Sequence, residues 1–564
     1  MANLVSPGVQ VKEIDLTNVV PSVSSTIGAM AGSFAWGPVN EVVTVSSETE
    51  LVNKFGKPDE NTFESVLSAA QFLSYGSALK VVRATGAAAR NATASGTGIL
   101  TQNITVFEGQ SPAATDWVQA RYPGVNGNAI GVAIAFGGSA MTDLVAGAVE
   151  GLPGTSAAAN AVRTVGTAID TSNDELHVVV YDADGTITGA VNTVLETWSY
   201  LSQASDVKSS SGSSLYYKDV INAGSDWIYI GNHAAAVTDA GESAAGNTFV
   251  RPADIAITLS GGVDDNVLTH GDTTTALGLF ADAETMDISL MFQSNSSLDA
   301  ADTITLGNYI TALCVARKDA VGFVSPERGA TVNAAAPATS VAAWRTGLSS
   351  TSYGFADSSS LYVYDKYNDK YRWIAAAGST AGLTANADLV ADAWFSPAGF
   401  TRGNVRNVTK LAWNPNQADR DALYKTGVNP IVTFPGSGTV LFGDKTLQAK
   451  PSAFDRINVR RLFIVLEKAV SIASKASLFE FNDEFTRAQF RNMVEPFLRD
   501  VKGRRGVTDF KVVCDGTNNT GAIIDTNKFV ADIYIKPARS INYITLNFIA
   551  TRTGVEFSEI AGGN

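Results

Sequence analysis

Apolar and polar residues alternate near both ends of the chain. A period of two residues is typical of a half-buried strand. The first of these segments follows a Pro7-Gly8 turn signal and precedes any segment that could form a domain. The sheet that it joins therefore has to be sought elsewhere. The apolar positions of the two terminal segments are Val9, Val11, Ile14, Ile544, Leu546, Phe548, Val555 and Phe557.

Between the ends, strand-like and helix-like patterns alternate. Residues 21–86 contain the strand-like STIGAMAGSFAW and EVVTVSS, the helix-like FESVLSAAQFLSYG and the strand-like ALKVVRATG. This order predicts a sheet that is covered by a helix. The same pattern resumes after residue 250 with DISLMF, LGNYITALCVARKD and AVGFVS. We therefore expect residues 21–86 to find their sheet partners in residues 251–400.

Residues 87–250 separate the two parts of this core. Their clearest strands are NAIGVAIAF, ELHVVVYDADG and DWIYIG, and the segment is rich in Ala, Gly, Ser and Thr. It holds 15 acidic residues against 5 basic ones. Because like charges and small polar residues favour solvation over packing, we expect an inserted, outward-facing domain of hairpins and short strands.

Two helices are predicted in the last third of the chain. Residues 454–476 place apolar side chains at three-and-four spacing, which is typical of an amphipathic helix. A second helical pattern runs from Asp483 to Lys502, with Gly503 where a left-handed cap belongs. Pro496 cannot donate a hydrogen bond in its interior, so we expect a kink or restart at Glu495. The apolar positions of the first helix are Leu462, Phe463, Leu466, Val470 and Ala473.

Length and composition bound the class of protein. A chain of 564 residues, 45% hydrophobic and 17% charged, predicts about three or four globular domains. No stretch approaches the ~20 apolar residues of a membrane helix, and the start lacks a secretory pattern, so folding in a cytoplasm is expected. Cys314 and Cys514 lie in apolar runs, which favours buried reduced thiols over a disulfide.

Signatures of catalysis or metal binding are weak. His177, His233 and His270 are scattered, without partners at ligand spacing. The segment YDADGTITG lacks a ligand pair that a calcium loop needs before its glycine, so a hairpin turn is the better interpretation. GSGTVLFGDKT resembles a phosphate loop, but Asp444 displaces the lysine and puts an anion where phosphate would sit. This segment is predicted to be a strand between glycine turns.

Charge is distributed unevenly along the chain. Residues 401–564 carry 23 Lys and Arg against 16 Asp and Glu, whereas residues 1–400 carry 18 against 39. Nucleic acid is a poor partner for the basic end, because the chain is acidic overall and aromatic residues do not interleave with the charges. An acidic protein surface fits better, although a solvated helix face would explain the pattern equally well. The basic residues are Arg456, Arg460, Arg461, Lys468, Lys475, Arg487, Arg491, Arg499, Arg504 and Arg505.

An ordered set of motifs resembles one known family. These motifs are SPGVQVKEID, GSFAWGPVNEVVTVSSETELVNKFGKP, ALKVVRATG, ARYPGVNGNAIGVAI, VVVYDADG, SSLYYKDVIN, LSGGVDDN, WNPNQADRDALYKTGVNPIV and FNDEFTRAQFRNMVEPFLRDVKGRRG. Each is loose alone, but their order over the whole chain is specific. The chain resembles the tail sheath proteins of T4-like contractile phages.

The resemblance implies an α+β multidomain fold with a discontinuous α/β core, an inserted β-rich outer domain and extended terminal β-arms. The expected parts are an N-terminal arm (1–20), the core (21–86 and 251–400), the outer insertion (87–250), a C-terminal inner α/β domain next to the tube (401–540) and a C-terminal arm (541–564). In this family the arms complete a sheet in neighbouring subunits, so the eight alternating positions above become intersubunit strand positions.

The family's activity is mechanical, so neither an enzyme nor a cofactor is expected. The resemblance implies a helical homo-oligomer around an inner tail tube that contracts to drive the tube through the host cell envelope. Baseplate and tail terminator proteins are further partners, and neither nucleic acid nor a membrane is bound directly. Assembly in the host cytoplasm and residence in the virion tail follow. The expected tube-facing residues are Arg460, Lys468, Lys475, Arg487, Arg491, Arg499, Arg504 and Arg505.

Two other interpretations remain open at this stage. The chain could be the sheath of a headless, phage-derived contractile injection particle, which the same motifs would fit. A β-rich surface-layer or carbohydrate-binding protein would belong to a different class, and it should carry a secretion signal.

Overall fold

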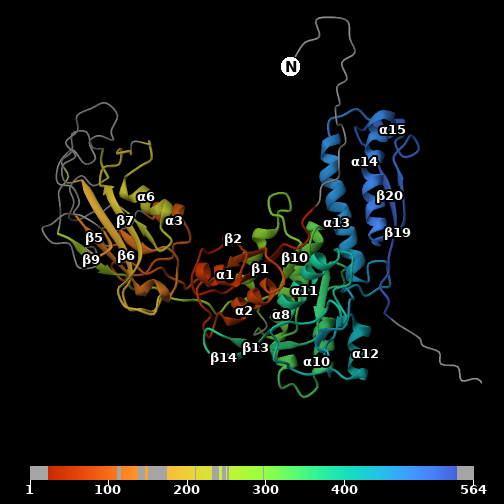
Figure 1. Cartoon of the computed structure of the whole chain (residues 1–564), viewed down its shortest axis with the longest axis horizontal. Helices are drawn as coiled ribbons and strands as arrows, with labels where there is room; N and C mark the ends of the chain where they lie inside the picture. The colour runs from red at the N-terminus through yellow and green to blue at the C-terminus, as the bar shows by residue number, and fades with distance from the viewer. Residues whose placement is uncertain are drawn as a thin grey trace, which may run out of the picture. The chain divides into compact units, whose positions relative to one another are not determined.

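The computed structural model describes residues 23–542, except for 111–115, 137–146, 150–173, 210, 232–240, 244–248, 250–252 and 296–297. The described residues form two compact units, and the boundary between these units lies between Ile472 and Ala473 (Figure 1). The alternating terminal positions predicted for the arms lie outside the described residues: Val9, Val11, Ile14, Ile544, Leu546, Phe548, Val555 and Phe557.

The first unit is organised around a sheet that has seven strands in the described part of the chain. Its order is β16-β12-β11-β10-β1-β3-β2, and every neighbouring pair is parallel except β2 and β3. β1 pairs with β10 on one side and β3 on the other, so strands from both sides of the inserted segment form one sheet, as predicted. The strands are β1 (Gly28–Gly32), β2 (Val42–Val45), β3 (Leu79–Arg83), β10 (Leu290–Phe292), β11 (Val321–Val324), β12 (Gly354–Asp357) and β16 (Val428–Asn429).

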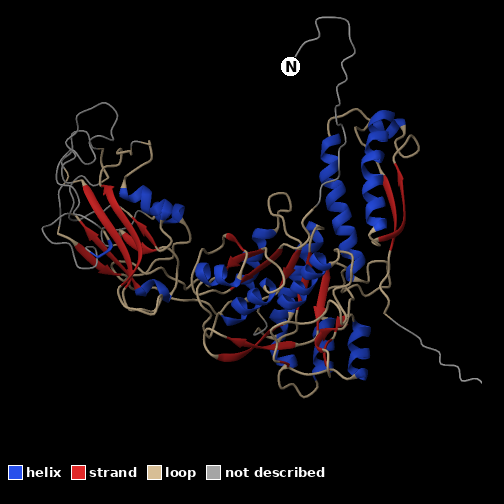
Figure 2. Ribbon diagram, in the orientation of Figure 1, coloured by secondary structure: helices blue, strands red, loops and turns tan. Residues whose placement is uncertain are grey.

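Successive side chains of these strands enter two different hydrophobic cores. Met30 lies in one core, whereas its neighbours Ala29 and Ala31 lie in the other, as the pleat of a strand requires. Helices α2 (Phe63–Leu73) and α11 (Ala377–Val390) fill the first core. The second core receives α7 (His270–Leu277), α8 (Ala300–Arg317), α10 (Pro337–Thr346) and α12 (Gln417–Thr426). Figure 2 shows these helices gathered around the strands.

The small residues of α11 allow it to pack closely against α2. A Cβ atom added to Gly378 would lie 2.5 Å from the carbonyl oxygen of Ser68, and one added to Gly382 would lie 2.5 Å from the ring of Tyr75. The run AGSTAGLTANA thus brings two helix backbones together, and a larger residue at Gly378 would push them apart.

Smaller elements complete this unit. Helix α1 (Glu48–Phe55), which the sequence did not predict, begins at Ser47, whose side chain accepts a hydrogen bond from the Glu50 amide. A second sheet has the order β14-β13-β15, and β17 and β18 form a hairpin. The remaining elements are β13 (Ser360–Asp365), β14 (Lys370–Ala375), β15 (Lys410–Leu411), β17 (Ile431–Phe434), β18 (Gly438–Leu441), η2 (Gly278–Phe280) and α9 (Arg328–Thr331).

The inserted segment is built mainly from antiparallel strands. One sheet has the order β7-β6-β5-β9, and β4 pairs with β8. Because β9 pairs with β5, this sheet extends beyond residue 250, where the end of the insertion was expected. The elements are β4 (Val118–Ala120), β5 (Ile130–Ala135), β6 (Glu175–Asp182), β7 (Thr193–Ser202), β8 (Ile228–Ile230), β9 (Ile255–Thr258), η1 (Val125–Ala129), α3 (Ile104–Gly109) and α6 (Tyr217–Gly224).

Aromatic and arginine contacts fasten the insertion to the core sheet. Trp36 stacks on Trp227 at 5.5 Å and meets Tyr122 edge-on at 5.3 Å. The buried guanidinium of Arg83, at the end of β3, donates to the carbonyl oxygens of Gly37 (2.9 Å) and Pro123 (2.7 Å). These contacts resist bending at the junction, since moving the insertion would leave a buried arginine unpaired.

The second unit follows α13 (Ile457–Ser474), whose last residues belong to it. Residues 401–472, expected in a C-terminal domain, therefore lie in the first unit. The other elements are η3 (Lys475–Ser477), α14 (Glu484–Gly503), β19 (Val507–Val513), α15 (Gly521–Ile524) and β20 (Asp532–Pro537). β19 and β20 pair beside α14 (Figure 1).

The structure departs from the cap predicted at Gly503 and from the restart that was predicted, as the alternative to a kink, at Glu495. The helix does not restart at Glu495 but continues through Pro496 to Gly503. The left-handed position is not Gly503 but Arg505, with φ 67°. Gly503 is the last helical residue, and Arg504 caps the helix through its amide.

Candidate assembly surfaces

Among the residues that the structure describes, the sheet of the second unit has two strands and both of its outer edges are unpaired. β19 and β20 pair antiparallel from Val507–Pro537 to Val513–Asp532, and no further strand joins them among the described residues. A two-stranded sheet presents unpaired backbone groups along both outer edges, and it is only marginally stable without a further strand or a packed helix. Buried residues of α14, including Phe490 and Leu498, give this sheet part of its support. Both edges are suited to receive an additional strand.

Four of the predicted tube-facing residues lie on the surface of this second unit. Lys475, Arg499, Arg504 and Arg505 are exposed. Arg504 forms an exposed ion pair with Asp500 at 3.1 Å, one helical turn away. One of these positive charges therefore lies in η3 and the other three lie near the C-terminal end of α14, and all four are exposed to solvent.

Arg487 and Arg491 are partly buried on α14. Arg487 donates to the carbonyl oxygen of Asn482 at 3.3 Å and to its side-chain oxygen at 2.8 Å. The guanidinium of Arg487 therefore holds the residues just before the helix in place, and we assign this arginine a structural role.

Arg460 and Lys468 are occupied inside the first unit. The guanidinium of Arg460, a residue only 7% exposed, lies 4.2 Å from the ring centre of Tyr353 and 4.0 Å from that of Phe454. The ammonium of Lys468 forms an ion pair with Asp287. The buried Arg461 likewise pairs with Asp388 and donates to the Ser25 carbonyl at 3.0 Å. The helical pattern placed these cations on a polar face, but neighbouring elements cover that face.

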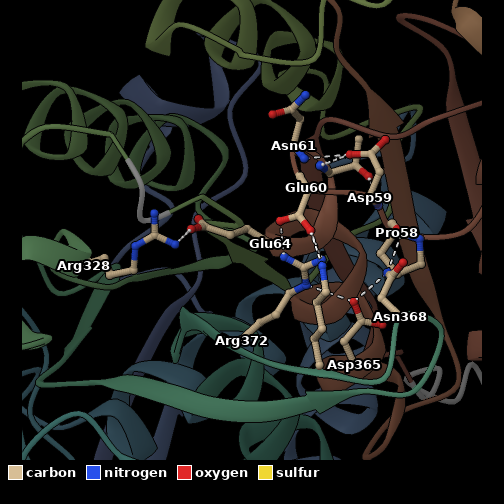
Figure 3. A network of polar contacts seen from close by, with 11 residues as sticks. Pro58, Asp59, Glu60, Asn61, Glu64, Arg328, Asp365, Asn368 and Arg372 are labelled. Carbon is tan, nitrogen blue, oxygen red and sulfur yellow. Dashed lines mark hydrogen bonds and ion pairs between the residues drawn. The ribbon is translucent and has the colours of Figure 1, made fainter.

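A network of ion pairs locks the loop before α2 onto the β13–β14 hairpin. Figure 3 shows Arg372 between Glu60 and Asp365. Its Nε lies 3.0 Å from the fully buried Asp365, and its Nη1 lies 2.7 Å from Glu60. Asn368 donates to Asp365 and to the Pro58 carbonyl, both at 2.8 Å. Hydrogen bonds from Arg372 and Lys370 lower the pKa of Glu60 to about 2.

A nearby pair joins α2 to α9. Glu64, buried in the first turn of α2, accepts a hydrogen bond from Arg328 Nη1 at 2.9 Å (Figure 3). Charged contacts of this type hold elements that are distant in sequence, so we expect the core of the first unit to move as one body.

Asp357 is an unusual buried carboxyl at the end of β12. Its Oδ2 accepts a hydrogen bond from Ser325 at 2.5 Å, and Ser325 accepts one from the Ala377 amide at 2.8 Å. Burial raises the pKa of Asp357 to about 7, and the hydrogen bond from Ser325 offsets only part of this shift.

The raised pKa of Asp357 predicts a loss of stability at neutral pH. The folded state holds a proton that the unfolded state releases near pH 4, so its contribution is complete below pH 4 and is lost as pH rises through about 7. The Asp357→Asn variant should therefore unfold at a higher temperature than the natural protein at pH 8. Its unfolding temperature should also depend less on pH. Thermal denaturation followed by circular dichroism between pH 5 and 8 measures both effects. Equal melting curves at pH 8 would contradict this assignment.

The candidate ligand loops are engaged in turns. Asp182 accepts hydrogen bonds from the amides of Gly185, Ile187 and Thr188 in the turn between β6 and β7, as the hairpin interpretation predicts. The segment around Asp444 contains β18 between turns, and Asp444 pairs with Arg456 at 3.2 Å.

Other candidate chemistry remains scattered. His177 accepts from the Tyr200 amide at 2.9 Å, and His270 pairs with Asp302 at 2.8 Å, while His233 lies outside the described residues. Cys314 and Cys514 are buried free thiols, as predicted. Within the described ranges, no cluster of three metal-binding side chains occurs and no helix could span a membrane.

Sequence reasoning missed a short run of strongly exposed apolar side chains. We define residues 478–485, which follow η3 and include the first two residues of α14, as the aromatic turn; it carries Leu478, Phe479, Phe481 and Phe485 on its surface. The signal was present in SLFEFNDEF, where aromatic and acidic residues alternate between two helices.

Family models match three segments of the chain. The tail sheath protein Gp18 domain III N-terminal region matches residues 25–84, the phage tail sheath protein central domain matches 297–447, and the phage tail sheath C-terminal domain matches 449–551. The first two segments flank the insertion and contain six of the seven strands of the central sheet, whereas β10 lies just before residue 297.

Solved structures share the fold at low sequence identity. A sheath tail protein from Listeria innocua matches with a TM-score of 0.54 and 13% identity, over 92% of this chain and 93% of that one. The contracted helical sheath of the anti-feeding prophage matches with a TM-score of 0.51 and 12% identity, over 98% and 100%.

Phage relatives match over the whole length of the chain. The tail sheath proteins of Vibrio phage KVP40, Enterobacteria phage T4 and Salmonella phage ViI are 33%, 32% and 34% identical to it. Each match covers 99% of this chain, and the shares of the relatives are 100%, 99% and 98%. The chain therefore belongs to the phage tail sheath protein family, and it is a structural subunit of a contractile tail sheath.

Proposed function

We propose that this subunit polymerises helically around an inner tail tube and that the resulting sheath shortens to drive the tube through a host cell envelope. The observation that carries the proposal is the two-stranded sheet β19–β20 with unpaired edges, in a chain whose two ends both have the pattern of strands. Relatives named as tail sheath proteins support it.

The arms would join subunits by strand addition. A strand added to the edge of β19 or β20 gains main-chain hydrogen bonds, and its alternating apolar residues select the register. The intersubunit positions are those predicted for the two ends, Val9, Val11, Ile14, Ile544, Leu546, Phe548, Val555 and Phe557. Arms of this kind keep neighbouring subunits connected while their bodies move.

The source of work would be the lattice of subunits and not a nucleotide. Arg372 and Arg461 are bound by buried carboxylates, which resists internal rearrangement of the first unit. A rigid subunit can store free energy only in its contacts with other subunits. The extended sheath would be metastable and the contracted sheath would have the better contacts, so the protein needs neither cofactor nor enzymatic activity.

The inner tube is the partner of the exposed basic side chains of the second unit. Weak charge contacts suit a surface that must release the tube in every subunit during contraction, because exposed ion pairs contribute only about 0–1 kcal/mol each. We keep Lys475, Arg499, Arg504 and Arg505 as the main tube-facing candidates and Arg487 and Arg491 as secondary ones. Arg460 and Lys468 are withdrawn, since they are engaged in the first unit.

Charge reversal tests the tube-facing assignment. The variant with Lys475→Glu and Arg499→Glu should assemble on purified tubes about tenfold less at low salt, and the deficit should shrink in 0.5 M salt as screening increases. Co-sedimentation with tubes measures this. The matched control, Lys57→Glu with Lys208→Glu, changes the net charge equally at exposed sites of the first unit. The assignment fails if both variants sediment with tubes alike.

The other partners and the setting follow from this role. Baseplate and tail terminator proteins would bind the two ends of the sheath, and the insertion would face outward. Assembly would take place in the host cytoplasm, without direct binding of nucleic acid or insertion into a membrane. The sheath of a headless injection particle is the second candidate, and the similarity to the anti-feeding prophage sheath favours it less than the phage relatives favour a virion.

A further inference from the structure

The aromatic turn exposes more apolar surface than a folded monomer usually leaves in water. Leu478 is 62% exposed, Phe479 104%, Phe481 85% and Phe485 76%. Four large apolar side chains within eight residues form a contiguous exposed cluster, and clusters of this kind mark interaction sites.

The backbone of the aromatic turn is held in place. Asn482 donates to the Lys528 carbonyl at 2.8 Å and to Asn519 at 3.2 Å, and its own oxygen accepts from Arg487 at 2.8 Å. Phe479 has a φ of 68°, a left-handed conformation that a bulky residue rarely adopts. The backbone of the turn is therefore preorganised. Phe479 keeps its strained conformation although its exposed side chain gains no contacts in the core that would compensate for the strain.

The charges of the aromatic turn are negative. Glu480 and Glu484 have no cation within ion-pair distance among the residues that the structure describes. Asp483 uses its side chain to cap α14 by accepting from the Thr486 amide at 2.8 Å. A partner of the turn should combine exposed aromatic surface with positive charge.

The first unit carries a surface with these properties. Phe400, Phe434 and Phe442 form what we call the phenylalanine cluster, with ring centres 5.2 to 5.9 Å apart. Phe400 is 55% exposed and Phe442 is 41% exposed.

Two arginines are close to the phenylalanine cluster, Arg420 in space and Arg402 in the sequence. Arg420 lies 5.7 Å from the ring centre of Phe434, and Arg402 lies on the loop that also carries Phe400. In the described part of the chain, neither has a carboxylate within ion-pair distance. The nearby acids of α12 are engaged, because Asp419 closes the capping box and Asp421 accepts from Gln417 at 3.0 Å.

We propose that the aromatic turn of one copy docks on the phenylalanine cluster of a second copy. Phenylalanine rings of both surfaces would be buried together, while Glu480 and Glu484 face Arg402 and Arg420 across the contact. The two surfaces differ, so the contact is heterologous, and repeating it produces a ring or an open helical array and not a closed dimer. The open helical array is the geometry that a sheath requires.

Charge exchange tests the proposal. Glu480→Lys with Glu484→Lys should lower the yield of sedimentable sheath at least tenfold, as should Arg402→Glu with Arg420→Glu. The variant that carries all four changes should recover most of the loss, because the charges are again opposite. Exposed acids of the first unit provide the matched control, Glu108→Lys with Glu284→Lys, which should assemble normally. Circular dichroism of each monomer confirms that it is folded.

Crosslinking shows directly which surface binds the aromatic turn. One preparation carries Phe481→Cys and another carries Phe434→Cys; the natural thiols are buried. A short bismaleimide should link two chains when the two are mixed and assembled, and each alone should give only background. Normal assembly of both charge-reversed variants would overturn the proposal. The proposal would also be overturned if the variant with all four charge changes stayed unassembled while its monomer is folded. The same holds if the cysteine at position 481 formed crosslinks only with tube protein.

Discussion

Loss of either terminal arm is expected to abolish sheath assembly and to leave a folded monomer. Deletion of residues 1–20, or truncation after Arg539, removes only strands that we assign to neighbouring subunits, and neither deletion touches a helix or strand that the structure describes. The unpaired edges of β19 and β20 would then receive no strand. Electron microscopy and sedimentation measure assembly, and circular dichroism measures folding.

Point substitutions in the N-terminal arm provide the matched control. In a docked strand the apolar face makes the side-chain contacts, so Val9→Asn with Val11→Asn should prevent ordered assembly. Gln10→Asn with Lys12→Asn changes the opposite face of the same strand and should be tolerated. Ordered sheath from both truncated forms would refute strand addition by the arms.

Arg372→Met is expected to destabilise the first unit by about 3–5 kcal/mol, because it leaves the carboxylate of Asp365 buried without its cation. The side chains of Arg372 and Asp365 are 8% and 0% exposed, and the guanidinium also covers the ring of Phe63 at 4.5 Å. Urea denaturation followed by tryptophan fluorescence measures the loss, since Trp373 lies next to Arg372 in β14.

Two further variants separate the buried pair from its exposed partner. Glu60 also binds Arg372 but is 68% exposed, so Glu60→Gln should change stability far less than Arg372→Met. Adding Asp365→Asn to Arg372→Met should recover part of the loss, because the buried charge is then absent. An equal effect of Glu60→Gln and Arg372→Met would show that the buried pair is unimportant.

The sequence predicted those parts of the fold in which local pattern and packing agree. α2 lies between β2 and β3 as the pattern of residues 21–86 indicates, and β10 continues that sheet on the far side of the insertion. The amphipathic pattern of 454–476 became α13. Periodicity is reliable here because each apolar face is covered by an element of the same unit.

Other features depend on contacts that no local pattern contains. Arg460 and Arg461 occupy polar positions of a helix, and only the folded structure places Tyr353 and Asp388 against them. The short helix α1 and the strand β9 have weak patterns and are stabilised by a cap and by pairing. Phe479, Phe481 and Phe485 resemble core residues in the sequence, yet they are exposed in the folded chain.

The most direct test of the sheath assignment is a negative-stain image of the purified full-length protein over a range of concentration and salt. We predict hollow, helically ordered tubes whose lumen can hold an inner tube. A homogeneous monomer under all conditions, with or without purified tail tubes, would contradict the account.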